Sequence, residues 1–94
     1  MTETERPALG EIDVFAGPLP HADDRRRFEG ALSRVPGARD VRGVATTGKT
    51  HRVRLRYSDA VPLAARLREV KEFRLRVIRE SSTMVQVLVD TLQR

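Results

Sequence analysis

The chain has 94 residues, enough for one domain with a single hydrophobic core and too few for two. It contains no cysteine, which excludes disulfides and thiolate metal sites, and no apolar run approaches the roughly 18 residues of a membrane span. The net charge is +5, and sixteen of the eighteen basic residues are arginine, which suits bidentate contact with carboxylates and phosphates.

Residues 1–8 are polar and acidic, and no apolar segment follows them. This pattern predicts a flexible leader without a secretory signal, so the cytoplasm is the expected location. Residues 9–94 would then form one domain. A compositional bias of the source genome is an alternative explanation for the many arginines.

The first half of this domain predicts a strand, a helix and a second strand. Residues 11–16 alternate with a period of two, and the Gly-Pro-Leu-Pro that follows ends the strand. Apolar residues within 21–35 recur at helical spacing, and a Pro-Gly pair ends that helix. Residues 40–45 indicate a weaker strand, and 46–49 a turn.

The second half contains two stretches in which arginine alternates with apolar residues, at 51–57 and 73–77, and the second of them predicts a strand over 73–79. That period is typical of half-buried strands, with the aliphatic side toward a core and the arginine side outward. Between them we expect a helix capped by Ser58-Asp59, with Pro62 in its first turn. Residues 84–89 predict a last strand, paired in a hairpin with the one before.

The predicted order is β-α-β-β-α-β with an extra C-terminal strand, which over residues 11–79 resembles the ferredoxin-like fold of small accessory and regulatory domains. The resemblance implies an α+β two-layer sandwich with both helices on one face of the sheet. It also implies that the first and third strands are central, that the fourth lies beside the first, and that the extra strand forms an edge. The expected core comprises Ile12, Val14, Phe28, Leu32, Val35, Val53, Leu55, Leu63, Leu67, Val70, Leu75 and Val77.

The outward side of this sheet is the most distinctive surface that the sequence predicts. By resemblance, Glu11 and Asp13 of the first strand lie between the arginines of two neighbouring strands, and opposite charges on neighbouring strands favour pairing. The five arginines nevertheless exceed the two acids. The candidate interaction surface comprises Phe15, Arg52, Arg54, Arg56, Arg74 and Arg76.

Three hypotheses remain open for this surface: an ion-pair lattice in water, a protein interface and a nucleic-acid interface. RNA-recognition modules share the strand order but stack bases on strand aromatics, whereas the third strand here presents arginines, so contact would be limited to the phosphate backbone. The leading hypothesis is a non-catalytic protein-interaction or regulatory module that acts through this face or an edge strand. A protein partner or a homo-oligomer is therefore expected, and nucleic-acid binding is the alternative.

Residues Gly43–Thr50 match the phosphate-loop pattern G-x-x-x-x-G-K-[ST], and the apolar run 85–90 ends in an aspartate, as a magnesium-binding strand would. A phosphate loop must open a helix whose amides hold the phosphates, but the arginine strand at 51–57 follows instead. The chain is also too short for the several βαβ units of a nucleotide-binding sheet. We therefore expect a hairpin turn here and no bound nucleotide.

Catalytic and ligand sites are weakly indicated. His21 and His51 are isolated, and no nucleophile lies beside a base at a useful spacing, so we expect no enzyme, no metal and no cofactor. Metallochaperones of this fold carry C-x-x-C in the first loop, which this chain lacks. Amino-acid-sensing domains of the ACT type use a glycine in that loop, and Gly17 makes a small-ligand sensor a further hypothesis.

Overall fold

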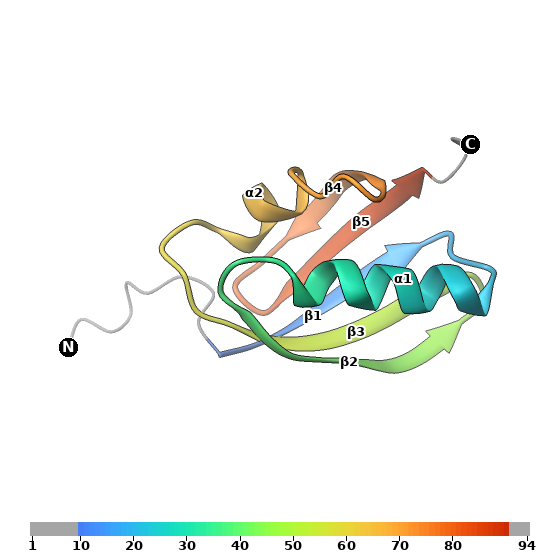
Figure 1. Ribbon diagram of the computed structural model, residues 1–94, viewed down its shortest axis with the longest axis horizontal. Coiled ribbons are helices and arrows are strands. Elements are labelled where there is room, and N and C mark those ends of the chain that lie inside the picture. Colours follow the sequence, from blue (N-terminus) through green and yellow to red (C-terminus); the bar gives the residue numbers. More distant parts are fainter. Residues whose placement is uncertain (1–9, 91–94) are drawn as a thin grey trace.

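A computed structural model describes residues 10–90, so the leader expected at 1–8 lies outside the described residues. The chain is α+β, as the sequence predicts, with two helices and one sheet (Figure 1). In chain order the elements are β1 (Gly10–Gly17), α1 (Ala22–Ser33), β2 (Ala38–Thr47), β3 (Thr50–Tyr57), α2 (Leu63–Leu67), β4 (Arg74–Glu80) and β5 (Met84–Asp90).

The sheet is mixed, and its strands lie in the order β2-β3-β1-β5-β4. β1 pairs antiparallel with β3 and parallel with β5, and β2–β3 and β4–β5 are antiparallel hairpins. The expected pairing of the first and third strands is confirmed. The expectation that the fourth strand lies beside the first is wrong, as is the edge position of the last strand: β5 takes the inner place and β4 the edge. β4 carries four charged residues and β5 only one, and an edge strand tolerates charge better than an inner one.

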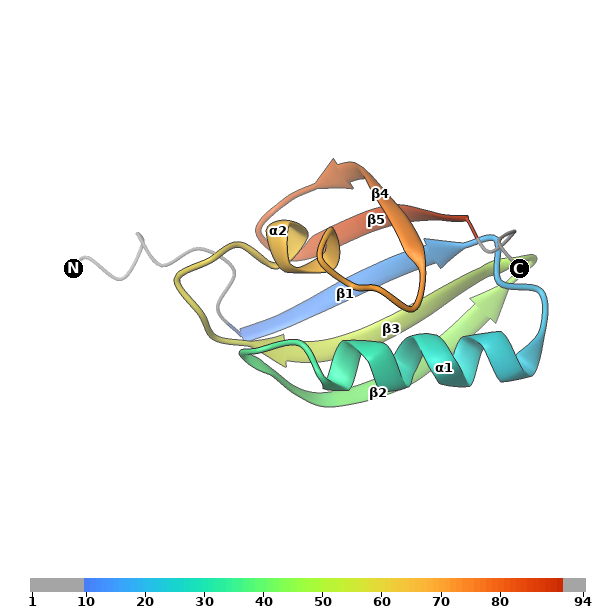
Figure 2. The same ribbon diagram turned by 45° about the horizontal axis from the view of Figure 1, so that its top comes forward.

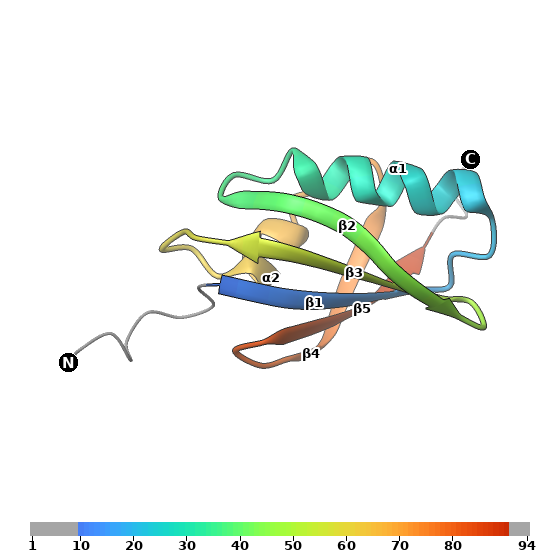
Figure 3. The same ribbon diagram turned by 90° about the horizontal axis from the view of Figure 1, so that it is seen from below.

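Both helices lie on one face of the sheet, where α1 crosses the β1–β3–β2 side and α2 lies near β4 and β5 (Figure 2). Figure 3 shows α1 above the strands, and in the described part of the chain no helix lies on the opposite face. The core fills the space between helices and sheet. Most of its expected members are buried, while Val70, Leu75 and Val77 are partly buried and pack against it, the latter two on the edge strand β4.

α1 is held by its apolar stripe. Phe28 and Leu32 are fully buried, and the Phe28 ring meets Phe73 edge-on, with centroids 5.8 Å apart. Asp23 and Asp24 occupy the first turn, where the helix dipole favours negative charge. The helix therefore anchors its inner face to the sheet and keeps its charged face in water.

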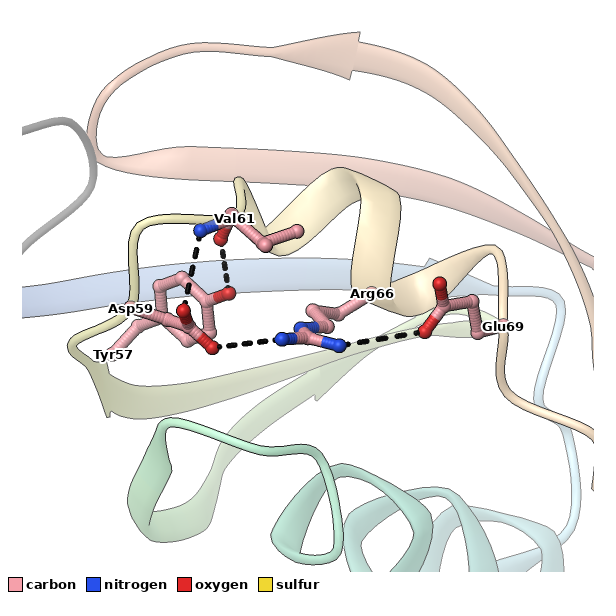
Figure 4. A network of polar contacts seen from close by, with 5 residues as sticks. All are labelled: Tyr57, Asp59, Val61, Arg66 and Glu69. Atoms are coloured by element: carbon pink, nitrogen blue, oxygen red, sulfur yellow. Dashed lines mark hydrogen bonds and ion pairs between the residues drawn. The ribbon is translucent and has the colours of Figure 1, made fainter.

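α2 has only five residues and begins later than the sequence predicts. The expected cap at Ser58-Asp59 is wrong, because Pro62 occupies the cap position. Asp59 instead accepts hydrogen bonds from the Val61 N–H (3.2 Å) and from Arg66 (3.1 Å), and the Tyr57 hydroxyl donates to the Val61 carbonyl (Figure 4). The hydrogen bond from the Val61 amide lowers the Asp59 pKa, and burial raises the Tyr57 pKa. Together these hydrogen bonds hold the loop that leads from β3 into α2.

Candidate nucleic-acid interface

The side of the sheet that the helices leave uncovered is rich in arginine, and we call it the arginine face. The outward positions of β2, β3 and β4 supply eight arginines, and those of β1 and β5 supply three carboxylates. All six predicted surface residues lie here. The arginines are Arg39, Arg42, Arg52, Arg54, Arg56, Arg74, Arg76 and Arg79, and the carboxylates are Glu11, Asp13 and Asp90.

Three of these arginines were not predicted from the sequence, because two β-bulges place them on this face. Arg39 and Arg42 are three residues apart, which in a regular strand puts them on opposite faces. A register shift between them leaves both opposite outward residues of β3. A second shift, between Val77 and Arg79, does the same on β4. Bulges commonly redirect side chains in this way, and spacing alone does not reveal them.

Asp13 joins β1 to β3 through two arginines. Its carboxylate accepts hydrogen bonds from Arg52 (2.8 Å) and Arg54 (2.9 Å). The Arg54 bond is the main reason that the Asp13 pKa lies below its ordinary value, and the same bond raises the Arg54 pKa. The sequence predicted these neighbours correctly, and the contact fixes two of the eight guanidinium groups.

Phe15 lies on the same face beside β3. The guanidinium of Arg52 sits 5.4 Å from the centre of its ring, a distance at which a cation is attracted to an aromatic face. Arg52 is thus held by both Asp13 and Phe15. The ring and the guanidinium thus lie against each other near the middle of the sheet.

The arginines of β4 lie farther from β1 than expected, since β5 separates them from Glu11 and Asp13. Arg74 faces Asp90 across the β4–β5 pair, and Arg76 faces Leu88. The arginine face is therefore divided into a β2–β3 side and a β4 side, with the outward residues of β1 and β5 between them.

Few of these arginines have an acidic partner. Within residues 10–90, only Arg52 and Arg54 of the eight form ion pairs with a carboxylate. Two arginine pairs even lie directly opposite each other, Arg39 with Arg56 and Arg42 with Arg54. Like charges in such positions weaken strand pairing, and an anion bound between them would offset that cost. For Arg54, the ion pair with Asp13 already offsets part of it.

The arginine face has little exposed apolar surface. The exposed large apolar residues of the described part are Val44, Ile78 and Leu88, and only Leu88 occupies an outward position of a regular strand pair on this face. Protein interfaces usually have an apolar centre, whereas nucleic-acid interfaces are more polar and more positively charged.

A second polar cluster lies on the helix side, around the buried His51. Its Nε2 is 2.6 Å from Glu29 of α1, and its Nδ1 is 2.9 Å from the Thr46 hydroxyl. Since a carboxylate only accepts, Nε2 carries the proton and donates to Glu29. Gly43 leaves the space for this contact, because a Cβ there would overlap Glu29 Oε2 and lie 3.1 Å from His51 Nε2. No pattern in the sequence indicates this pair, which joins residues 22 positions apart.

The segment that matches the phosphate-loop pattern lies in the β2–β3 hairpin, as predicted, and the strand β3 follows it directly in place of a helix. Its two glycines have structural roles: Gly43 admits the Glu29–His51 contact, and Gly48 has a positive φ of 62° at the hairpin turn. The sequence Gly43–Thr50 thus forms a turn between two paired strands, and the absence of nucleotide binding stays a prediction.

The loop after β1 packs against the same hairpin. The Leu19 N–H donates to the Lys49 carbonyl at 2.7 Å, and a Cβ on Gly17 would lie 3.1 Å from that carbonyl. Gly17 is therefore explained by this close approach, and a small ligand at this loop stays a prediction. The described residues contain no cluster of His, Asp and Glu suited to a metal ion, and neither of their helices has the length and apolar character needed to cross a membrane.

Comparisons with protein-family models, with curated proteins and with solved structures found no significant match to this chain.

Proposed function

We propose that this protein is a non-catalytic module that binds the phosphate backbone of nucleic acid through the arginine face. The observation that carries the proposal is the uncovered side of the sheet, where eight arginines meet three carboxylates and only Arg52 and Arg54 have an ion-pair partner among the described residues. Such an excess of guanidinium groups suits phosphates, which accept bidentate hydrogen bonds. In this proposal the fold is a variant of the ferredoxin-like sandwich, and the protein acts in the cytoplasm.

Charge argues against self-association through this face. A second copy would bring the same excess of arginine against the first, and like charges at an interface are strongly unfavourable. The scarcity of exposed apolar surface also favours a phosphate backbone over a protein partner.

A protein with an acidic surface is the second candidate partner, and one observation favours it. Phe15, Met84 and Leu88 occupy outward positions of β1 and β5, between the two groups of arginines. An apolar strip with an arginine rim is also found in protein interfaces. A regulatory module that docks on an acidic protein would use the same arginines.

The test is a titration of a fluorescent single-stranded oligo-dT, followed by anisotropy at several salt concentrations. Four to eight arginine–phosphate contacts predict a log–log salt slope between about −2.8 and −5.6, with binding that persists near 150 mM salt. Arg26→Ala/Arg34→Ala, which removes the same charge from exposed positions in α1 and at its C-terminal cap, is the matched control for Arg54→Ala/Arg56→Ala.

The control should bind like the wild type, and the variant on the face should bind weakly. Equal weakening in both would mean that net charge alone drives binding, and no binding at low salt would reject the proposal. Titration with fluorescent poly-L-glutamate in parallel tests the acidic-protein alternative, which gains support only if that polymer binds more tightly than the oligonucleotide.

A further inference from the structure

We infer that the β2–β3 side of the arginine face is the phosphate-binding site, and that it holds the backbone of a single-stranded nucleic acid, with Arg39 and Arg56 as its anchor. This inference rests on the proposed function and deepens it, because it names the part of the face that binds and the form of the partner.

The first evidence is the pairing of arginines across β2 and β3. Arg39 lies directly opposite Arg56, and Arg42 directly opposite Arg54. Residues opposite each other in a sheet project from the same face with Cβ atoms roughly 5 Å apart, and Arg54 and Arg56 are about 6.8 Å apart along β3. Four arginine side chains thus start from a small rectangle of the sheet. Asp13 holds the Arg54 guanidinium, whereas the other three have no ion-pair partner within residues 10–90 and can contact successive phosphates.

The second evidence is the backbone that creates this rectangle. Asp40 lies in the bulge between Arg39 and Arg42 and has a φ of 53°, a backbone conformation that residues other than glycine seldom adopt. Such strain persists only where the surrounding structure holds it, and it is concentrated at functional sites. Without this bulge, Arg39 and Arg42 would lie on opposite faces.

The third evidence is a hollow of about 330 Å³ lined by Arg39, Asp40 and Arg56. Within residues 10–90, the side chains of Arg39 and Arg56 form no hydrogen bond or ion pair, although Asp40 lines the hollow and Glu11 lies opposite Arg56 on β1. Two guanidinium groups without a partner among the described residues, at one hollow, suit a doubly hydrogen-bonded phosphate group.

The β4 side lacks these features. Arg74 and Arg76 face Asp90 and Leu88 rather than other arginines, so no like-charge pair is formed there. They are nevertheless exposed and carry the same charge. This makes Arg74→Ala/Arg76→Ala a matched control for Arg39→Ala/Arg56→Ala.

A single strand fits the site better than a duplex. A flexible strand can follow a twisted sheet along β3 and can stack a base against Phe15 or against the Arg52 guanidinium, because bases stack on both aromatic rings and guanidinium planes. A duplex keeps its bases inside and offers none for stacking.

The test compares the two double variants in titrations with oligo-dT and with a duplex of the same length. Arg39→Ala/Arg56→Ala should weaken binding to oligo-dT about tenfold or more and reduce the salt slope by about 1.4, that is, about 0.7 for each lost contact. Arg74→Ala/Arg76→Ala should weaken binding and reduce the slope less than Arg39→Ala/Arg56→Ala does, and the duplex should bind more weakly than the single strand.

Two further measurements separate binding from stability. Arg39→Ala/Arg56→Ala should melt at or above the wild-type temperature, because it removes a like-charge pair. Inorganic pyrophosphate should raise the melting temperature of the wild type and of the β4-side variant, but not that of Arg39→Ala/Arg56→Ala.

The outcomes distinguish this inference from the proposed function. If both variants show the same loss of affinity and the same reduction of the salt slope, the whole face binds. The role of Arg39 and Arg56 as the anchor is then rejected, while the proposed function survives. Tighter binding of the duplex rejects the single-stranded partner. If the wild type does not bind oligo-dT, both ideas fail, and a pyrophosphate effect confined to the anchor would then show an anion site without a nucleic-acid role.

Discussion

Gly43→Ala tests how one methyl group in β2 acts on the buried contact between α1 and β3. The new Cβ would overlap Glu29 Oε2 and lie 3.1 Å from His51 Nε2. Glu29 can yield, because 30% of its side chain is exposed and can turn into water. His51 cannot follow, since only 7% of its side chain is exposed, so its Nε2–H loses its acceptor.

The cost follows from that unpaired donor. A buried hydrogen-bonding group without a partner costs about 1–3 kcal/mol, whereas replacing glycine by alanine returns about 0.4–1 kcal/mol through the unfolded chain. The central values of these two ranges leave a net loss of about 1.3 kcal/mol. For a domain of this size, that loss lowers the melting temperature by roughly 5–10 °C. Urea unfolding followed by circular dichroism measures this loss directly.

A double-mutant cycle with Glu29→Ala decides whether the mechanism is correct. Once Glu29 is truncated, the methyl group has nothing to displace, so adding Gly43→Ala should cost nothing or stabilise the protein slightly. An equal loss in both backgrounds would show that the methyl group acts elsewhere in β2. Wild-type stability of Gly43→Ala alone would refute the proposed contact.

Three other changes probe the core, the Asp13 contact and the hairpin. Leu67→Asp places a carboxylate at a fully buried position and should unfold the domain; a cooperative transition at the wild-type melting temperature would contradict the core assignment. The Arg54 hydrogen bond lowers the Asp13 pKa below its ordinary value of 3.8, so this contact stabilises the folded state above that pH and is lost as the pH falls through the lowered pKa. In thermal melts between about pH 5 and pH 2, Asp13→Asn should therefore lose less stability than the wild type. Lys49→Ala should leave any binding of ATP, measured by calorimetry, unchanged, and a large loss of affinity would restore the phosphate-loop hypothesis.

The regular strands were predictable because their side chains obey a strict period of two. Alternation placed Asp13 and Phe15 outward on β1, and Arg52 and Arg54 outward on β3, and these strands pair in continuous register. The contacts of Asp13 with both arginines follow from that register. Where the backbone is regular, the spacing of residues in the sequence was sufficient to predict which side chains face outward and which of them meet.

The prediction of side-chain orientation failed where the backbone is irregular, and the prediction of strand order failed because it depends on the whole sheet. Alternation could not place Arg42 and Arg79 because bulges shift the register before each of them. The order of β4 and β5 depends on which strand of the hairpin buries better beside β1. The lower charge of β5 favours the inner place, but alternation within either strand does not show which of the two takes it. The Glu29–His51 contact joins α1 to β3 across 22 positions, and the residues next to each of them in the sequence do not indicate that the two side chains meet.

The arrangement of the arginines also bears on an alternative explanation, the protection of sheet edges. Charged residues and bulges on edge strands prevent sheets from pairing with one another, and both β2 and β4 are bulged, arginine-bearing edges. Edge protection does not require arginines on the inner strand β3, nor their alignment with arginines of β2.

These two roles predict different behaviour for the same variant. If Arg39 only protects the edge formed by β2, the double variant should aggregate and keep its phosphate binding. If Arg39 and Arg56 bind phosphate, the variant should stay monomeric, melt no lower than the wild type and lose affinity, because their like charges cost folding free energy that the ligand offsets. Sedimentation velocity of Arg39→Ala/Arg56→Ala alongside the melting curves therefore separates edge protection from phosphate binding.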